Sequence, residues 1–464
     1  MPKGGLLLAM LLWLAGCGAT AQPTQPTALP APTLLPTPAP PPTATPLPTP
    51  TLVPTAVPGV LYVDAGQGLG PISPFVYGTN YGPWCIVPYD LMPQAEAAGI
   101  TYLRFPGGNW GDQNDLTEFQ VDDFIALARK LGAEPSISVR LLGGTPEQAV
   151  ALVNYARDRG YHVRYWSIGN EPNLFDKDEY DTVQYNAEWR TFAQAMKAAD
   201  PEILLVGPDI SQYRGNPFSD PHDRFGHDWM TEFLRANGDL VDVVSIHRYP
   251  FPTGLNAPPA RIDWLRRNSR EWDLIIPRLR ATVREVTGRD LPVAVTEVNS
   301  HWSSATGGEA TPDSFYNAIW WADVLGRLVR QRVDIVAHFA LQSRTQVGGW
   351  GLFGRFEVRP TYYVYPIYRH FGRDLIYASS DDPDLSIYAA LRDDGALTIM
   401  VINLGPQERS RPLLLDHAAA SGPAEVWRFD AQHPAERIAE QALAGGDLLT
   451  LPAQSVTLYI VPQR

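Results

Sequence analysis

Eight short apolar runs between residues 75 and 339 constrain the fold of this chain more than any other feature of its sequence. Segments with helical spacing of apolar residues separate most of the runs, so strands and helices are expected to alternate. Eight strand–helix pairs over roughly 300 residues fit an α/β fold that closes into a (β/α)8 barrel better than an open, doubly wound sheet. The predicted strands are residues 75–78, 102–105, 134–139, 163–169, 203–207, 241–247, 293–297 and 335–339, and the predicted helices include 121–131, 145–157, 185–199, 311–330 and 361–371.

The pattern changes after residue 371, where short apolar runs and tight turns replace the helices. Asp393-Asp394-Gly395 is typical of a hairpin turn. We therefore expect a barrel over residues 59–372 and a small C-terminal β-sandwich over residues 373–464. The apolar run at residues 60–63 could add a strand to the sandwich, which would join the two ends of the folded part. The predicted strands of the sandwich are residues 386–391, 397–403, 424–429 and 456–461.

The N-terminus resembles a secretory signal of the bacterial lipoprotein type. Lys3 precedes an apolar stretch at residues 6–14 that is too short to span a bilayer, and Leu14-Ala15-Gly16-Cys17 resembles a lipobox. Cleavage before Cys17 would leave a cysteine that carries lipid, and several acyl chains anchor a protein stably where one chain does not. We expect residues 1–17 to be the signal and the protein to be lipid-anchored at the cell surface. An ordinary signal peptide with a chance cysteine stays open.

Residues 18–58 are predicted to be a tether. Pro, Thr, Ala and Leu recur there without charge and without amphipathic spacing, so the segment cannot bury enough surface to fold. Proline-rich chains favour an extended conformation of about 3.1 Å per residue. A domain held away from its anchor suits a bulky extracellular polymer, although the same tether would serve a sensor or a binding protein.

The composition argues against nucleic-acid and anionic-membrane partners and against an intrachain disulfide. A formal net charge of -13 argues against a nucleic acid or an anionic membrane surface as partner, because both select clustered Lys and Arg. Only two cysteines are present, so lipidation of Cys17 would leave Cys85 without a disulfide partner. No base is evident beside Cys85, which is therefore interpreted as a small buried side chain rather than a nucleophile. Oligomeric state leaves no signal in the sequence.

Two glutamates close predicted strands in the barrel. Glu171 follows the fourth apolar run, in Asn170-Glu171-Pro172, and Glu297 ends the seventh, after Thr296. Barrel enzymes carry their catalytic groups at the carboxyl ends of the strands. Glycoside hydrolysis requires one carboxylic acid and one carboxylate on opposite sides of the scissile bond. A lone glutamate would more often be an ion-pair partner, but two in these positions predict a glycosidase that needs no cofactor.

Four motifs in this order along the chain resemble those of the clan A glycoside hydrolases, which are retaining enzymes. This resemblance rests on the four motifs and covers the whole predicted barrel. The nearest branches are the arabinofuranosidases, the β-xylosidases and the β-glucuronidase-like enzymes. The motifs are Arg104-Phe105-Pro106-Gly107-Gly108-Asn109, Asn170-Glu171-Pro172, Ser245-Ile246-His247-Arg248-Tyr249-Pro250 and Thr296-Glu297.

The resemblance implies a role for several residues of these motifs. Glu171 would be the acid/base and Glu297 the nucleophile, while Asn170 would reach the sugar 2-hydroxyl. Arg104 would lie under the nucleophile, and physical chemistry agrees, because a cation and a hydroxyl donor such as Tyr249 both favour an ionised carboxylate. The simpler interpretation of Arg104 is an ion pair in the barrel floor. The remaining implied substrate-binding residues are Asn109, Tyr249 and His247, the last of which could instead be a core histidine.

Aromatic side chains are the other expected ingredient, because the C–H faces of sugars stack on flat rings. Trp110, Trp302 and Trp350 follow the second, seventh and eighth runs, although ordinary packing would explain any one of them equally well. His301 and Trp302 lie just beyond Glu297. The eighth run ends in His338-Phe339, where many clan members place a Trp, so the floor of the first subsite could be built differently.

Two patterns are discounted as sites. Gly66-Gln67-Gly68-Leu69-Gly70 is glycine-rich, but prolines and no helix start follow it, which argues against a dinucleotide site. The segment 112–115 has clustered oxygen ligands but lacks the Gly and Glu of a calcium loop, so a solvated loop is expected. We predict an arabinofuranosidase- or β-xylosidase-like hydrolase. An endo-β-glucanase, a transglycosidase and a non-catalytic carbohydrate-binding lipoprotein stay open as alternatives.

Overall fold

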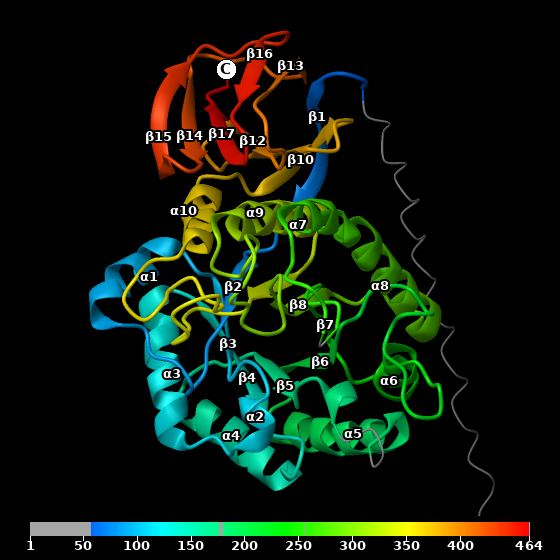
Figure 1. The fold of residues 1–464 in the computed structure, drawn as a ribbon. Coiled ribbons are helices and arrows are strands. Elements are labelled where there is room, and N and C mark those ends of the chain that lie inside the picture. The colour runs from blue at the N-terminus through cyan, green and yellow to red at the C-terminus, as the bar shows by residue number, and fades with distance from the viewer. Residues whose placement is uncertain (1–56, 176–179, 255, 464) are drawn as a thin grey trace, which may run out of the picture. The chain divides into compact units, whose positions relative to one another are not determined.

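A computed structural model describes residues 57–175, 180–254 and 256–463. The predicted signal, Cys17 and all but the last two residues of the predicted tether lie outside these ranges. Eight parallel strands form a closed barrel in chain order, in which β9 pairs with β2 (Figure 1). The predicted barrel is confirmed, and all eight strands were found in the sequence. They are β2 (Phe75–Asn80), β3 (Tyr102–Phe105), β4 (Glu134–Val139), β5 (Tyr165–Ile168), β6 (Leu204–Ser211), β7 (Val243–Arg248), β8 (Val293–Val298) and β9 (Ile335–His338).

Helices fill the connections between the strands and begin at recognisable caps. Thr117 and Gln120 form a capping box at the start of α3, and Thr145 and Gln148 form another at α4. Within the described ranges, no helix is long and apolar enough to cross a membrane. The main helices are α1 (Met92–Ala98), α2 (Trp110–Gln113), α3 (Glu118–Leu131), α4 (Pro146–Asp158), α5 (Thr182–Ala199), α6 (Trp229–Asn237), α7 (Ile262–Asn268), α8 (Trp272–Thr287), α9 (Phe315–Arg330) and α10 (Val364–Arg369), and the short 3-10 turns are η1 (Tyr89–Leu91), η2 (Pro172–Leu174), η3 (Ser269–Glu271) and η4 (Pro360–Tyr363).

The remaining strands form one curled nine-stranded sheet with its own apolar core. β1 lies inside this sheet, antiparallel to β10 and parallel to β13, so the apolar run at residues 60–63 starts a strand of the sheet. The fold class, a (β/α)8 barrel with a sandwich-like C-terminal part, is therefore confirmed. In sheet order the strands are β15 (Pro434–Gln441), β14 (Ala424–Phe429), β17 (Ser455–Val461), β12 (Leu397–Asn403), β11 (Leu385–Leu391), β10 (Asp374–Ser380), β1 (Leu61–Pro71), β13 (Arg409–Asp416) and β16 (Leu448–Leu451).

α9 joins the barrel to the sheet. Nearly every residue of this helix is buried, as expected for a helix that is covered on all sides. Its Tyr316 hydroxyl donates to Leu404 O (2.8 Å), and its Asp323 accepts from the Tyr388 hydroxyl of β11 (2.6 Å). Arg327, one turn further along, donates to Asp323 (2.9 Å). Buried polar contacts and continuous apolar packing thus hold the two parts together.

The polar junction between α9 and β11 should matter for stability. Asp323 is fully buried, so its removal leaves the Arg327 guanidinium and the Tyr388 hydroxyl without their shared acceptor. We expect Asp323→Ala to lower the free energy of unfolding by about 3 kcal/mol or more. The measurement is urea unfolding followed by fluorescence. Asp158→Ala is the matched control, because Asp158 pairs with Arg157 on the surface and should change stability by less than about 1 kcal/mol.

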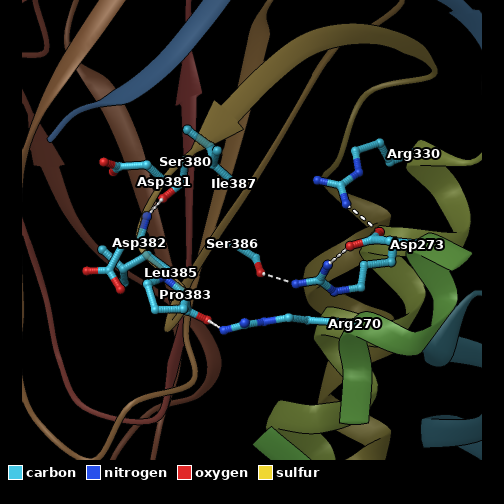
Figure 2. Close-up of a pocket in the computed structure, with 11 residues that line it drawn as sticks. Arg270, Asp273, Arg330, Ser380, Asp381, Asp382, Pro383, Leu385, Ser386 and Ile387 are labelled. Carbon is cyan, nitrogen blue, oxygen red and sulfur yellow. Dashed lines mark hydrogen bonds and ion pairs between the residues drawn. The ribbon is translucent and has the colours of Figure 1, made fainter. Parts of the chain in front are cut away.

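The space between α9 and the sheet also holds a polar cavity of about 280 Å³ (Figure 2). Arg327 and Arg330 share the carboxylate of Asp273 there, and Arg327 also donates to the Ser386 hydroxyl (3.1 Å). Arg327 and Arg330 thus both have acceptors, and the cavity belongs to the polar junction between α9 and the sheet.

Candidate active site

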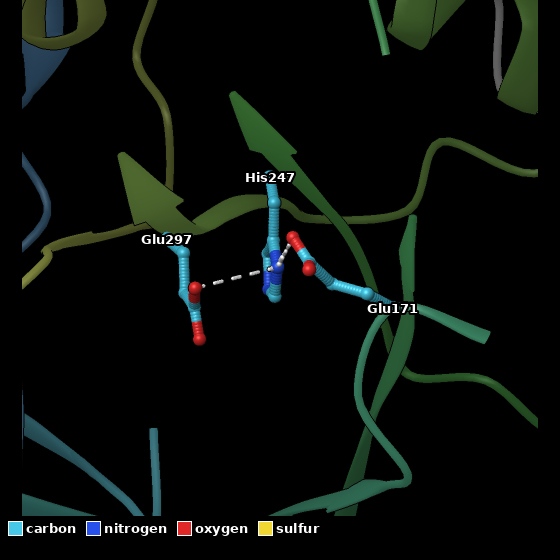
Figure 3. Close-up of side chains that lie close together, drawn as sticks. All are labelled: Glu171, His247 and Glu297. Carbon is cyan, nitrogen blue, oxygen red and sulfur yellow. Dashed lines mark hydrogen bonds and ion pairs between the residues drawn. The ribbon is translucent and has the colours of Figure 1, made fainter. Parts of the chain in front are cut away.

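Glu171 and Glu297 meet at the carboxyl ends of β5 and β8. Glu171 lies just past β5 in a left-handed backbone conformation (φ 48°), which turns the chain into η2. Glu297 is the penultimate residue of strand β8 and is 2% exposed. His247 of β7 lies between the two carboxylates (Figure 3). One oxygen of each carboxylate and one nitrogen of His247 lie within 4.8 Å of one another.

Three donors converge on the carboxylate of Glu297. Arg104 Nη1 and the backbone N–H of Gly108 donate to Oε1 at 2.7 and 2.6 Å. The Tyr249 hydroxyl donates to Oε2 at 2.6 Å, and burial followed by the charge of Glu297 raises the pKa of this hydroxyl well above its ordinary value. The side chain of Glu297 is therefore fixed in one orientation, as a nucleophile requires.

Arg104 connects the nucleophile to the rest of the site. It is fully buried, and its Nη2 donates to Asn170 Oδ1 (2.9 Å) and to Asp209 Oδ2 (3.0 Å). Burial lowers the pKa of Arg104, but the charges of Asp209 and Glu297 outweigh burial and raise it overall. Arg104 is therefore a permanent cation, and the ion pair with Glu297 that both interpretations of the sequence expected is present.

Asp209 is a member of the site that sequence reasoning missed. It lies near the end of β6, accepts from Arg104 and from the Thr296 hydroxyl (2.5 Å), and is 1% exposed. Burial raises the pKa of Asp209, but the adjacent Arg104 guanidinium lowers it well below the usual range. The signal in the sequence was a carboxylate just after the predicted strand at residues 203–207, in the slot where Glu171 follows the fourth strand. Asn80, at the end of β2, was missed in the same way and accepts from Arg104 (3.2 Å).

His247 contacts both glutamates and approaches Asp209. Its Nδ1 is 3.0 Å from Glu171 Oε1 and 3.7 Å from Glu297 Oε2, while Nε2 lies 3.6 Å from Asp209 Oδ1, beyond hydrogen-bond distance. Burial lowers the pKa of His247, but Glu297 together with Asp209 and Glu171 raises it to about 9. The imidazole is fully buried and does not line the pocket that Glu171 and Glu297 line. His247 therefore contacts both carboxylates from a buried position, where the sequence had left a sugar-site residue and a core histidine open.

The charge of His247 gives the fold a pH dependence. A folded-state pKa of about 9 against an ordinary value of 6.5 means that the imidazolium stabilises the fold fully below pH 6.5. This contribution is lost as the pH rises through 9. We expect the melting temperature of the wild type to fall by a few degrees relative to His247→Asn over that interval. Differential scanning calorimetry of both proteins measures the two melting temperatures. A difference between them that is constant at every pH would contradict the charge assigned to His247.

Asn170 and Asp112 shape the loop that carries Glu171. The backbone N–H of Asn170 donates to Asp112 Oδ2 (2.7 Å), and Asp112 also accepts from the backbone N–H groups of Leu141 and Leu142. Asp112 is 4% exposed, so the expectation of a solvated loop is wrong for this residue. The Asn170 side chain donates to Asn109 Oδ1 (2.9 Å), and only Asn109 of the two lines the pocket.

The two glutamates open into a pocket with a volume of about 510 Å³. Trp302 and Trp350 line it, and their indole N–H groups donate to Pro252 O (2.8 Å) and His301 O (2.7 Å). Phe339 lies on the same wall, 5.5 Å from the Trp350 ring in a T-shaped arrangement. The pocket thus combines aromatic surface with the carboxylates, Asn109, Gln212 and Tyr249, which is the composition expected of a sugar site.

Three residues of interest lie outside this pocket. Trp110 lines an adjoining cavity instead. His301 is buried, which lowers its pKa to about 4, and it contributes its carbonyl to Trp350. Cys85 is 1% exposed and burial raises its pKa to about 12, in agreement with a small buried side chain.

The chain resembles carbohydrate-active enzymes in sequence. No protein-family model matches it. Mouse heparanase is 23% identical over 387 residues, which cover 74% of this chain and 68% of heparanase. Rat heparanase is 27% identical, but the match spans only 47% of its length, about half. An intracellular exo-α-(1→5)-L-arabinofuranosidase of Streptomyces lividans is 25% identical over 35% of this chain and 30% of its own.

Solved structures share the fold over most of both chains. An α-L-arabinofuranosidase from Thermotoga maritima superposes with a TM-score of 0.69 at 18% identity, and a Paenibacillus polymyxa xyloglucanase with 0.68 at 16%. Each match covers 87% of this chain and 99% of the other. Together, the barrel, the carboxylates at the ends of β5 and β8, and the sequence relatives identify the chain as a clan A glycoside hydrolase. Within that clan it lies near the arabinofuranosidases.

Proposed function

We propose that the protein hydrolyses glycosidic bonds with retention of configuration, through a covalent intermediate on Glu297. The observation that carries this proposal is the short separation of the carboxylates, with one oxygen of each within 4.8 Å. Retaining enzymes hold their carboxyl groups about 5–5.5 Å apart, whereas inverting enzymes need about 6.5–9.5 Å to admit a water molecule.

In the first step, a carboxylate oxygen of Glu297 bonds to the anomeric carbon while Glu171 gives its proton to the departing oxygen. In the second step, a water molecule gives a proton to Glu171 and its oxygen replaces Glu297 on the anomeric carbon. Glu297 loses its charge on forming the ester, so the carboxylate that Glu171 becomes no longer faces a second anion. The His247 Nδ1, 3.0 Å from Glu171 Oε1, then supports the new charge.

For the substrate, we infer an extracellular oligo- or polysaccharide cleaved in an arabinofuranosidase- or β-xylosidase-like reaction. The Streptomyces and Thermotoga arabinofuranosidases support this choice. A second candidate is an endo-acting enzyme, which is supported by the fold shared with an endoglucanase from Clostridium thermocellum (TM-score 0.66 at 16% identity). We further propose that a lipid on Cys17 holds the enzyme at the bacterial surface.

The test measures turnover of two substrate panels by a protein that comprises residues 59–464. Glu297→Ala is the inactive reference. The first contains aryl arabinofuranosides, xylosides, glucosides, galactosides and glucuronides. The second contains arabinan, xylan, xyloglucan, β-glucan and heparan sulfate. Proton NMR of the first product formed should show the anomer of the substrate, whereas the opposite anomer would overturn the retaining mechanism. Binding without turnover would favour the carbohydrate-binding lipoprotein.

Glu171, His247 and Glu297 are also close enough to hold a metal ion, so metal dependence needs its own test. Both oxygens of Glu297 already accept hydrogen bonds, and Arg104 lies 2.7 Å from one of them. A metal cation placed beside this guanidinium and the charged imidazole would be repelled by both. We expect dialysis against EDTA to leave kcat/KM unchanged. A loss that Ca²⁺ or Zn²⁺ restores would assign the three side chains to a metal site instead.

A further inference from the structure

A second cavity adjoins the catalytic pocket and neither glutamate lines it. We call it the aromatic chamber and define it by Trp84, Trp110, Phe339, Trp350 and Arg344. Its volume is about 320 Å³, which is within the range of ligand pockets. Phe339 and Trp350 line both cavities, as do Gly108 and Asn109, so the two spaces meet at one wall.

Three rings of the chamber, those of Trp84, Phe339 and Trp350, are held in place by one another and by the backbone. Trp84 lies 5.5 Å from Phe339 at 31°, and its Nε1 donates to Gly107 O (3.1 Å). Phe339 in turn packs on Trp350. Ser343, Thr345 and the exposed Arg344 add hydroxyl and guanidinium groups beside the rings. Flat apolar faces next to hydrogen-bonding groups match a sugar ring, which has an apolar C–H face and hydroxyls at its edge.

The chamber lies on the side of the pocket away from the acid. Its residues come from the loops after β2, β3 and β9, which are neighbours around the barrel. Glu171 and the pocket residues Leu174, Ser211 and Gln212 come from β6 and the loops after β5 and β6. Because Glu171 protonates the oxygen that departs, the departing part of the substrate lies on its side. The chamber therefore faces the part of the substrate that stays on Glu297.

We propose that the aromatic chamber binds a second sugar unit, joined to the non-reducing side of the unit that Glu297 attacks. The substrate class is then a glycan chain that places at least two units on this side of the scissile bond. The smallest product carrying the new reducing end is a disaccharide. This inference rests on the proposed hydrolase mechanism. Within it, the second subsite favours the second candidate, endo-type or disaccharide-releasing action, over release of single sugars.

The test compares aryl glycosides of one and of two units of the sugar that the aryl panel identifies. The wild type should turn over the disaccharide glycoside with a kcat/KM at least tenfold higher. Trp110→Ala should lower kcat/KM for the disaccharide glycoside at least tenfold more than for the monosaccharide glycoside. Trp302→Ala is the matched control, because Trp302 lines only the catalytic pocket and should lower both values by the same factor. Arg344→Ala should show the same selective loss of kcat/KM as Trp110→Ala. Because Arg344 is exposed, this variant keeps the test decisive if Trp110→Ala does not fold.

The outcomes separate this inference from the proposed function. Mass spectrometry of polysaccharide digests should show disaccharides or longer products. Release of single sugars only, or equal loss on both aryl substrates in Trp110→Ala and Arg344→Ala, overturns the second subsite and leaves the hydrolase intact. No turnover of any panel member by the wild type overturns the proposed function and the inference together.

Discussion

Glu297→Ala should abolish turnover, with kcat/KM lower by about four to six orders of magnitude, as for other nucleophile deletions. The physical reason is that no other carboxylate can take its place. Asp209 is engaged by Arg104 and Thr296, and Glu171 lies on the side of the leaving group. The measurement is release of aryl leaving group by protein whose melting curve shows that it is folded.

Adding azide to Glu297→Ala should test the nucleophile role of Glu297 further. Azide can enter the space that the Glu297 carboxylate vacates and attack the anomeric carbon from the same side. The expected product is a glycosyl azide of inverted configuration, formed in a single displacement. Glu285→Ala serves as the matched control, because Glu285 is exposed on α8 and should leave activity unchanged. Undiminished hydrolysis by Glu297→Ala would remove this residue from the nucleophile role.

Glu171→Ala should have the second largest effect, and its size should depend on the leaving group. We expect kcat/KM for substrates with poor leaving groups to fall by about 10²–10⁴, because their departing oxygen needs a proton. Dinitrophenyl glycosides need no protonation, so the intermediate should form and accumulate as a burst of dinitrophenol. Azide should then release a glycosyl azide of retained configuration. Equal losses for good and poor leaving groups would contradict the acid role of Glu171.

The carboxylate pair was predictable because it depends on local order along the chain. Parallel strands in a barrel all end on one face, so two strand-end glutamates must approach each other once the strand count is known. The strand-end positions of Asp209 and Asn80 were visible in the sequence, but their roles were not. Those roles come from contacts with Arg104 across 105 and 24 residues of sequence, which no local pattern encodes.

The missed strands have a similar physical explanation. β15 and β16 are the edge strands of the nine-stranded sheet, and β13 pairs with one of them. β15 is largely exposed and carries alternating charges, so its sequence lacks the apolar run by which most of the inner strands were found. β10 is an inner strand with buried apolar residues that the sequence analysis missed as well. Exposed charge protects such edges from unwanted pairing, and the same charge conceals them from hydrophobic patterning.

The placement of β1 has a mechanical consequence. The chain enters its folded part at the sheet, where Gly59 N donates to Asp381 (2.9 Å) and β1 pairs with strands on both sides. Tension arriving from the N-terminal side is therefore borne first by the backbone ladders of β1 with β10 and β13, which are loaded along their length. The loops that carry Glu171 and Glu297 belong to the barrel and follow these ladders along the chain. Tension applied to the N-terminal segment is thus met by the sheet before it reaches the barrel.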